Sequence, residues 1–332
     1  MDLNPIAIYE DYINNRLDRF TAIKQLISII ENYDNDIIRE DSIKILDKIN
    51  LKNENLFYLL ENLLVSDSNE KIRIAAGIYL REHHLNDSLA VFKWVIQHET
   101  SYQCLLTIIE ALVKINSKES KEILIKQIKK IRNTKYINTE KGYENKKYKE
   151  ALKHLIRRNK ILNYSHKQLG AILINFFTIK SLIEEIPNVY FELNPSNLLV
   201  KKLDLSDYLE FEVKGTPWGW KNNIQSLSRI KCLKNLKNLQ ILNLSNNHIK
   251  EIKDLVEIKS LIHLDLSNNK ISDPQNIEYL KQIPLLEFID LRGNEIANFI
   301  NVSEFSPKIR ILKESPLKDL ENRLEKRLES IK

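Results

Sequence analysis

Ile241 to Lys250 reads ILNLSNNHIK, and His263 to Ser272 reads HLDLSNNKIS. The two stretches share their leucines and both asparagines, and Leu242 and Leu264 lie 22 positions apart. Catalytic motifs rarely recur in one chain at such a spacing, whereas the sequences of stacked structural repeats recur regularly. The sequence therefore predicts a repeat architecture for this part of the chain.

The repeated phrase belongs to a longer frame, which begins as Leu239-x-x-Leu242-x-Leu244-x-x-Asn247-x-Ile249 and recurs from Leu261 and from Leu286. Alternation in Leu-x-Leu is typical of a short strand with its leucines inward, and a buried asparagine after it can satisfy the amides of a turn. This frame resembles leucine-rich repeats, in particular their 22-residue class. The resemblance implies a horseshoe with short parallel strands and a structural ladder of asparagines: Asn247, Asn269 and Asn294.

Both flanks of the frame depart from it. Val200-x-x-Leu203-x-Leu205 keeps the strand pattern but has Tyr208 where the frame has asparagine, and an insert with Trp218 and Trp220 follows. The two tryptophans are predicted either as an exposed contact or as a buried cap. Ile309-x-x-Leu312 predicts a last strand, and apolar residues at three- and four-residue spacing then predict a capping helix: Leu317, Leu320, Leu324 and Leu328.

The N-terminal part shows helical periodicity from Phe20 to Ile131, with short polar gaps. The segment IREDSIKIL (38–46) aligns with IRIAAGIYL (72–80) and, more loosely, with CLLTIIEAL (104–112). Small Ala75 and Ala76 are expected to let neighbouring helices approach closely. This pattern resembles HEAT repeats of the bilin-lyase-like kind, which implies a stacked all-α solenoid and an interaction surface. No lyase activity follows, because no substrate-binding residue matches.

Together these patterns predict a two-part repeat protein: an all-α HEAT-like solenoid followed by an α/β leucine-rich repeat horseshoe. The expected boundaries are 1–131 for the solenoid, 132–190 for a basic helical connector and 191–332 for the leucine-rich repeat domain with its C-terminal capping helix.

An excess of positive charge lies in the connector and in the segment just before it. Lys114 to Lys167 holds 17 Lys and Arg against 5 Asp and Glu, although the whole chain has a net charge of only +6. A helix within 146–162 would place four cations on one face: Lys149, Lys153, Arg157 and Lys160. Such a stripe is a possible anion-binding site for nucleic acid in the segment 146–160, although a solvated helix face explains it as well.

Signals for enzymatic chemistry are weak. The sequence has six glycines and lacks the glycine-rich phosphate loops and the paired histidines of metal sites, so neither a cofactor nor a metal is expected. His263 beside Asp265 is the one candidate acid–base pair, and display on a surface explains it equally. Cys104 and Cys232 lie apart in apolar segments and are expected to be reduced, which favours a cytoplasmic location. No segment predicts export or membrane insertion.

The predicted binding site is the concave face of the horseshoe, where strand residues alternate outward. We expect these residues to contact a protein partner: Asp204, Ile241, Asn243, His263, Asp265, Phe288, Asp290 and Arg292. Apolar side chains beside acidic ones suit a partner with an aliphatic spot and basic neighbours. The sequence thus predicts a non-catalytic scaffold or adaptor. The alternatives are a nucleic-acid-associated protein and a regulatory subunit of a phosphatase or small GTPase.

Overall fold

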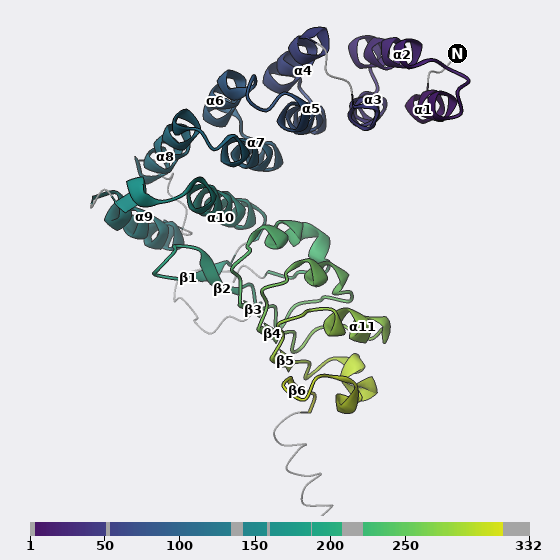
Figure 1. The fold of residues 1–332 in the computed structure, drawn as a ribbon. Coiled ribbons are helices and arrows are strands. Elements are labelled where there is room, and N and C mark those ends of the chain that lie inside the picture. Colours follow the sequence, from purple (N-terminus) through teal and green to yellow (C-terminus); the bar gives the residue numbers. More distant parts are fainter. Residues whose placement is uncertain are drawn as a thin grey trace, which may run out of the picture. The chain divides into compact units, whose positions relative to one another are not determined.

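The computed structural model describes residues 4–50, 54–133, 142–157, 160–186, 188–207 and 222–314. It divides into two compact units, one formed by residues 1–133 with 158–173 and the other by residues 134–157 with 174–332. The described residues between 5 and 185 form helices and short turns, and a small sheet with short strands follows (Figure 1). None of the helices in these ranges has the length and apolar character needed to cross a membrane.

The first unit is built of helices joined by short turns. Those within it are α1 (Pro5–Ile13), α2 (Arg19–Asn32), α3 (Asp36–Ile49), α4 (Glu54–Ser66), α5 (Glu70–His83), α6 (Leu89–His98), α7 (Tyr102–Ile115), α8 (Lys118–Asn133) and the 3₁₀ helix η1 (Lys160–Asn163). The three aligned sequence segments fall within α3, α5 and α7. These helices pack against one another in order, with α2, α4 and α6 forming a second row (Figure 1).

Local signals explain where these helices begin and end. Asn35 caps α3 by accepting from the amides of Ile37 and Ile38, and Ser101 caps α7 in the same way. Both helices end at an asparagine in the left-handed region, Asn50 with φ 57° and Asn116 with φ 54°. Asparagine adopts that conformation more readily than most residues, so the polar gaps in the sequence act as stop signals.

Two buried ion pairs join successive helix pairs of the first unit. Arg39 of α3 lies 2.6 Å from Asp67, which follows α4, and Arg73 of α5 lies 2.8 Å from Glu99, which follows α6. Burial alone would raise the pKa of Glu99, but hydrogen bonds from Arg73 and from the amides of Ser101 and Thr100 bring it down to about 2. Arg39 and Arg73 occupy the same position in the aligned segments, so the repeat in sequence is also a repeat of these links.

The second unit contains one six-stranded sheet in sequence order, with the strands on one side and short helices on the other (Figure 1). Its strands are β1 (Tyr190–Leu193), β2 (Val200–Asp204), β3 (Ile241–Asn243), β4 (His263–Asp265), β5 (Phe288–Asp290) and β6 (Arg310–Leu312). From β2 to β6 the strands are parallel, and Leu203, Leu242, Leu264, Ile289 and Ile311 lie in register. The predicted side-by-side stacking of the Leu-x-Leu segments is confirmed, and their leucines are fully buried.

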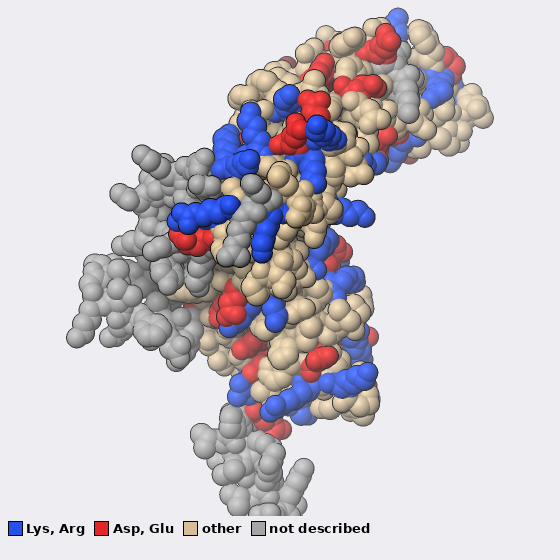
Figure 2. Space-filling model, turned by 60° about the vertical axis from the view of Figure 1, so that its left-hand side comes forward, with Lys and Arg blue, Asp and Glu red and all other residues tan. Residues whose placement is uncertain are grey.

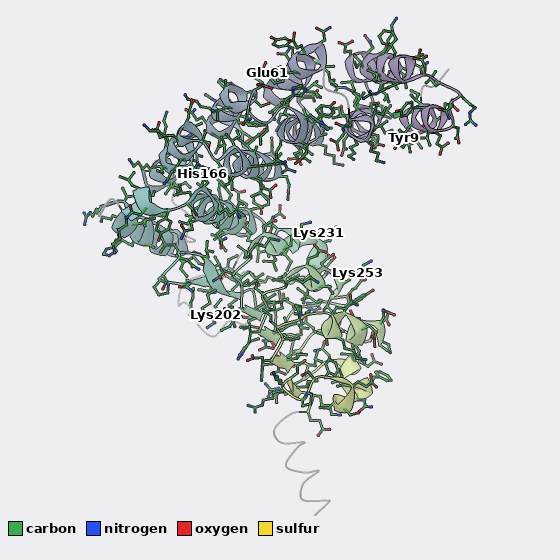
Figure 3. All side chains as sticks on the ribbon, viewed as in Figure 1. Tyr9, Glu61, His166, Lys202, Lys231 and Lys253 are labelled. Atoms are coloured by element: carbon green, nitrogen blue, oxygen red, sulfur yellow. The ribbon has the colours of Figure 1, made fainter. Side chains whose placement is uncertain are left out.

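The returns between strands are mostly 3₁₀ helices, as the apolar period of three indicates. They are η2 (Leu227–Asn235), η3 (Lys253–Glu257), η4 (Glu295–Phe299) and η5 (Val302–Glu304), while the longer third repeat forms α11 (Gln275–Lys281). Lys202 lies on the strand side of this unit, and Lys231 and Lys253 lie on the side of the 3₁₀ helices (Figure 3).

Two further helices and one strand complete the second unit's N-terminal end. Helix α9 (Gly142–Arg157) belongs to it, and α10 (His166–Glu185) begins in the first unit and ends in the second. Strand β1 pairs antiparallel with β2, which the sequence pattern did not predict. Within this unit the amide of Val200 donates to Asn175 of α10 at 2.9 Å, which ties the start of β2 to the helix. Trp218, Trp220 and the expected capping helix from Leu317 to Leu328 lie outside the described residues.

Candidate functional site

A ladder of buried asparagines holds the strand ends in place. The side-chain amide of Asn269 donates to the carbonyls of Leu244 and Leu266 at 2.9 Å and of Ser267 at 3.3 Å. Its side-chain oxygen accepts from the amide of Ile249 at 3.0 Å. Asn247 and Asn294 repeat this arrangement one strand earlier and one strand later. Each side chain therefore bonds to its own turn and to the turn before it.

Asn222 forms the first rung of this ladder. It donates to the carbonyls of Asn188, Leu205 and Ser206 and accepts from the amide of Asn188 at 2.8 Å. The sequence frame placed Tyr208 at this position, so the interpretation that this repeat lacks its asparagine was wrong. The rung comes after residues 208–221, and Asn222-x-Ile224 continues the frame beyond that insertion.

The first asparagine of each Ser-Asn-Asn sequence forms the turn, whereas the second forms the buried ladder. Asn246 and Asn268 have φ of 58° and 53°, and Gly293 stands at the same place in the next repeat with φ 72°. The chain must turn sharply here to bring the second asparagine under the strands. Residues that tolerate the left-handed region are therefore required, which explains why both asparagines recur.

Side chains between the buried ones form two columns on the exposed side of the sheet, which we call the strand face. The parallel register sets its first column as Lys202, Ile241, His263, Phe288 and Arg310, and its second column as Asp204, Asn243, Asp265, Asp290 and Leu312.

Stacked side chains make up much of the first column. The rings of His263 and Phe288 lie 5.6 Å apart at 29°, and the guanidinium carbon of Arg310 lies 6.0 Å from the centre of the Phe288 ring. His263 and Arg310 are exposed, while Ile241 and Phe288 are partly buried. An apolar strip with a cationic end thus crosses three strands, and stacking keeps its side chains in place before any partner arrives.

Side chains of the second column stabilise the turns that follow the strands. Asp204 and Asp265 each use one carboxylate oxygen to accept from the amide and hydroxyl of the serine two residues later, Ser206 and Ser267. Asn243 accepts from the amide of Ser245 in the same manner and donates to Asp204 at 3.0 Å. These bonds fix the turn after each strand and leave both aspartates partly exposed.

Asp290 departs from its expected role as an acidic contact. It is only 3% exposed and accepts a bidentate pair of hydrogen bonds from Arg292, from Nε to Oδ1 and from Nη2 to Oδ2. These bonds raise the pKa of Arg292 further above its ordinary value, so its guanidinium stays charged. Arg292 and Asp290 therefore neutralise each other, and the negative charge that the strand face displays comes from Asp204 and Asp265.

The four cations of the predicted anion-binding stripe fall in different parts of the structure. Arg157 is exposed at the end of α9 in the second unit, whereas Lys160 is exposed in η1 of the first. Lys153 lies 3.9 Å from Glu150, and the side chain of Lys149 lies outside the described residues. On the face that Figure 2 draws, Lys and Arg are interspersed with Asp and Glu.

Within the described part of the chain, groups of three or more His, Cys, Asp or Glu side chains suited to a metal ion do not occur. Cys104 and Cys232 are free and buried. Burial raises the pKa of the Cys232 thiol to about 12 and that of the Cys104 thiol even further, so neither is a reactive thiolate at neutral pH.

Comparison with known families agrees with the geometry of the strands and ladder. The Leucine Rich Repeat family matches residues 238–257 and 260–280, which contain β3, β4 and their asparagine rungs. No curated protein matches the chain in sequence. Leucine-rich repeats are generally protein-interaction modules. The C-terminal part of this chain thus contains a leucine-rich repeat region.

Proposed function

We propose that the protein is a non-catalytic, cytoplasmic scaffold or adaptor that binds a protein partner on the strand face. In this proposal the second unit is a leucine-rich repeat horseshoe and the strand face is its concave surface. The first unit is a HEAT-like solenoid that offers a second surface. The free, buried cysteines support a reducing compartment, and the repeated Arg–acid links of α3 and α5 support the solenoid interpretation.

The stacked strip of His263, Phe288 and Arg310 carries the proposal. Aromatic and arginine side chains are enriched in protein interfaces, and a few such residues often provide most of the binding energy. Here they are held in position by one another. Asp204 and Asp265 lie in the adjacent column, so a basic side chain of the partner is expected next to its apolar contact.

Affinity purification with quantitative mass spectrometry tests this proposal. The double variant Phe288→Ala/Arg310→Glu removes the ring and reverses the charge at the end of the strip, and it leaves the turn-fixing Asp265 and the buried Asp290–Arg292 pair in place. Its matched control is Phe299→Ala, because Phe299 is 56% exposed on η4, away from the strand face. We expect the double variant to lose specific partners that the wild type and the control retain. The same partners at the same abundance for all three proteins would refute the proposal.

A further inference from the structure

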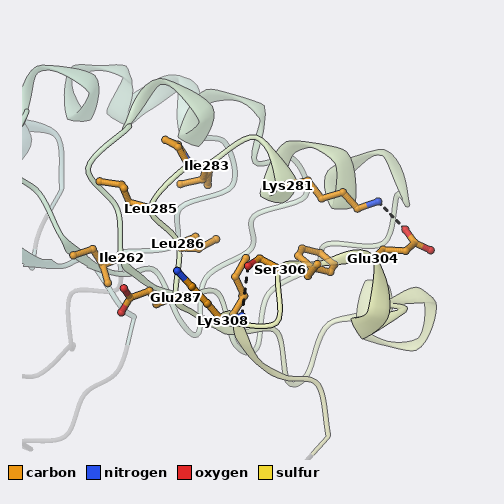
Figure 4. A pocket seen from close by; sticks show the side chains of 12 residues that line it. Ile262, Lys281, Ile283, Leu285, Leu286, Glu287, Glu304, Ser306 and Lys308 are labelled. Atoms are coloured by element: carbon orange, nitrogen blue, oxygen red, sulfur yellow. Dashed lines mark hydrogen bonds and ion pairs between the residues drawn. The ribbon is translucent and has the colours of Figure 1, made fainter.

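An open hollow of about 420 Å³ lies in the second unit, at the edge where the strands begin (Figure 4). One wall is the segment from Lys281 to Glu287, which leads from α11 into β5, and the other is the segment from Glu304 to Ile309, which leads into β6. Ile262, the residue before β4, contributes to the same end as Leu285.

The hollow arises from a break in the repeat frame. Leu239, Leu261 and Leu286 occupy the first frame position of successive repeats and are at most 4% exposed. The sequence pattern placed Ile309 and Leu312 in the positions of Leu286 and Ile289, but this register was wrong by one residue. Strand β6 pairs Ile311 with Ile289, so the next residue of the series is Lys308. Lys308 is exposed, and the buried leucine that would pack against Leu286 is missing from the last repeat.

The lining is apolar below and charged at the mouth. Leu286 and Phe305 form buried parts of the lining, at 4% and 6% exposure. Leu285 is 55% exposed, whereas the equivalent residues of earlier repeats are the polar Asn238 and Ser260. Ser260 donates to the carbonyl of Leu239 at 2.8 Å, a bond that leucine cannot make. The third repeat therefore presents an apolar side chain where Ser260 of the second repeat bonds to the repeat before it.

The charged groups at the far end of the hollow are already paired. Lys281 lies 2.7 Å from Glu304 and 2.8 Å from Glu278, as Figure 4 shows for the first pair. Small-molecule sites usually combine an apolar lining with a few polar groups that orient the ligand. Lys281 and Glu304 are engaged with each other, while Glu287 and Lys308 also line the hollow. The buried part of the lining, Leu286 and Phe305, is apolar and favours an aliphatic side chain there.

We infer that this hollow receives a leucine-like side chain from the bound partner, which completes the series Leu239, Leu261 and Leu286. The inference rests on the proposed function. Glu287 and Ile309 line the hollow and directly precede Phe288 and Arg310, so the hollow continues the strand face. One partner segment thus contacts the stacked strip and anchors its aliphatic side chain beside Leu285, which is the arrangement of a hot-spot residue in a pocket.

Random peptides displayed on phage provide the probe, selected on the full-length protein and counter-selected on Lys308→Leu. That variant places a leucine next in the series, where it should pack against Leu286 and occupy the apolar part of the hollow. It is therefore also expected to raise the unfolding temperature, which separates the effect from misfolding. The selected peptides are expected to share one leucine, isoleucine or methionine. Changing this residue to alanine, or using the Lys308→Leu or Leu285→Glu protein, should weaken binding about tenfold or more.

Val302→Glu is the matched control, because Val302 is an apolar residue with 47% exposure in the adjoining η5 but outside the lining. It should leave peptide affinity unchanged. Peptides without a shared aliphatic residue, or equal binding to wild type and Lys308→Leu, would overturn the inference. Self-association of the wild type that Lys308→Leu abolishes would overturn it as well, in favour of a second copy of the chain.

Phe288→Ala distinguishes this inference from the proposed function. Partner binding that depends on Phe288 but not on Lys308 would leave the strand face as the binding site and refute the anchor in the hollow. If peptide binding depends on Lys308 but the binding of cellular partners does not change in Phe288→Ala, the strand face is refuted as the binding site.

Discussion

The two units differ in the kind of side chain that joins one repeat to the next. In the helical unit, buried charges make the links: Arg39 with Asp67 and Arg73 with Glu99, whose side chains are 5% to 17% exposed. In the strand unit, the neutral side chains of Asn222, Asn247, Asn269 and Asn294 bond to backbone groups of two successive turns. The link between Arg73 and Glu99 therefore depends on the protonation state of a carboxyl group, whereas the asparagine links do not.

Secondary structure accounts for this difference. Helices satisfy their own backbone groups except at the ends, so the links between helix pairs fall to side chains that reach from one helix to the loop of the next. A strand unit turns after every three to five strand residues and leaves many turn amides and carbonyls buried. Those groups need a partner with both a donor and an acceptor, which the asparagine amide provides.

The largest effect is expected for Asn269→Ala in the strand unit. The change removes about four buried hydrogen bonds, at about 1 kcal/mol each, so unfolding should become easier by about 4 kcal/mol. Denaturation followed by circular dichroism measures the loss, and hydrogen exchange of β3 to β5 locates it. Asn268→Gly is the matched control, because glycine accepts the same backbone conformation and Asn268 is exposed. An equal loss for both variants would contradict the ladder's structural role.

A smaller effect, about 3 kcal/mol, is expected from acid in the helical unit. The pKa of Glu99 in the folded chain, about 2, lies below its ordinary value of 4.5. The pair with Arg73 therefore stabilises the fold fully above pH 4.5, and this contribution is lost as the pH falls from 4.5 to 2. Unfolding measured between these limits should vary less with pH for Glu99→Gln than for the wild type.

Glu119→Gln is the control for that titration. Glu119 pairs with Lys93 at 3.1 Å, but its side chain is 54% exposed, and exposed pairs contribute little. Its pH profile should follow the wild type. A Glu99→Gln profile that also follows the wild type would contradict the view that buried charges hold the helical unit together.

The frame of leucines predicted the strand unit well, because its spacing depends on packing that every repeat shares. The parallel strands and their register follow directly from Leu242, Leu264 and Ile289. It did not predict Asn222, because residues 208–221 separate that rung from its strand in the sequence. It also did not predict β1, since an antiparallel edge strand belongs to no repeat.

The candidate site was only partly predictable for a related reason. Alternation shows which residues point outward, and it placed Ile241, His263 and Phe288 in one column. Alternation does not show which outward residues bond to each other. Asp290 and Arg292 are spaced like contacts for a partner, yet they pair with each other and bury the carboxylate. The hollow beside Leu286 likewise becomes apparent only when the register identifies Lys308 as the missing leucine.

The smallest effect is expected at Gly293, where the strand unit replaces its usual asparagine. Gly293→Ala should destabilise that unit by about 2 kcal/mol, because alanine is strained at φ 72° and its Cβ would collide with the side-chain oxygen of Asn268. Gly293→Asn meets the same crowding, but asparagine tolerates this backbone conformation, as Asn246 and Asn268 do, so its loss should be about half as large. Thermal unfolding of the two variants measures the difference. Equal losses would mean that glycine is required in the last frame because of crowding against Asn268 and not because of the backbone conformation. The side chains at this turn position would then contact one another from repeat to repeat, as a second ladder beside the buried asparagines.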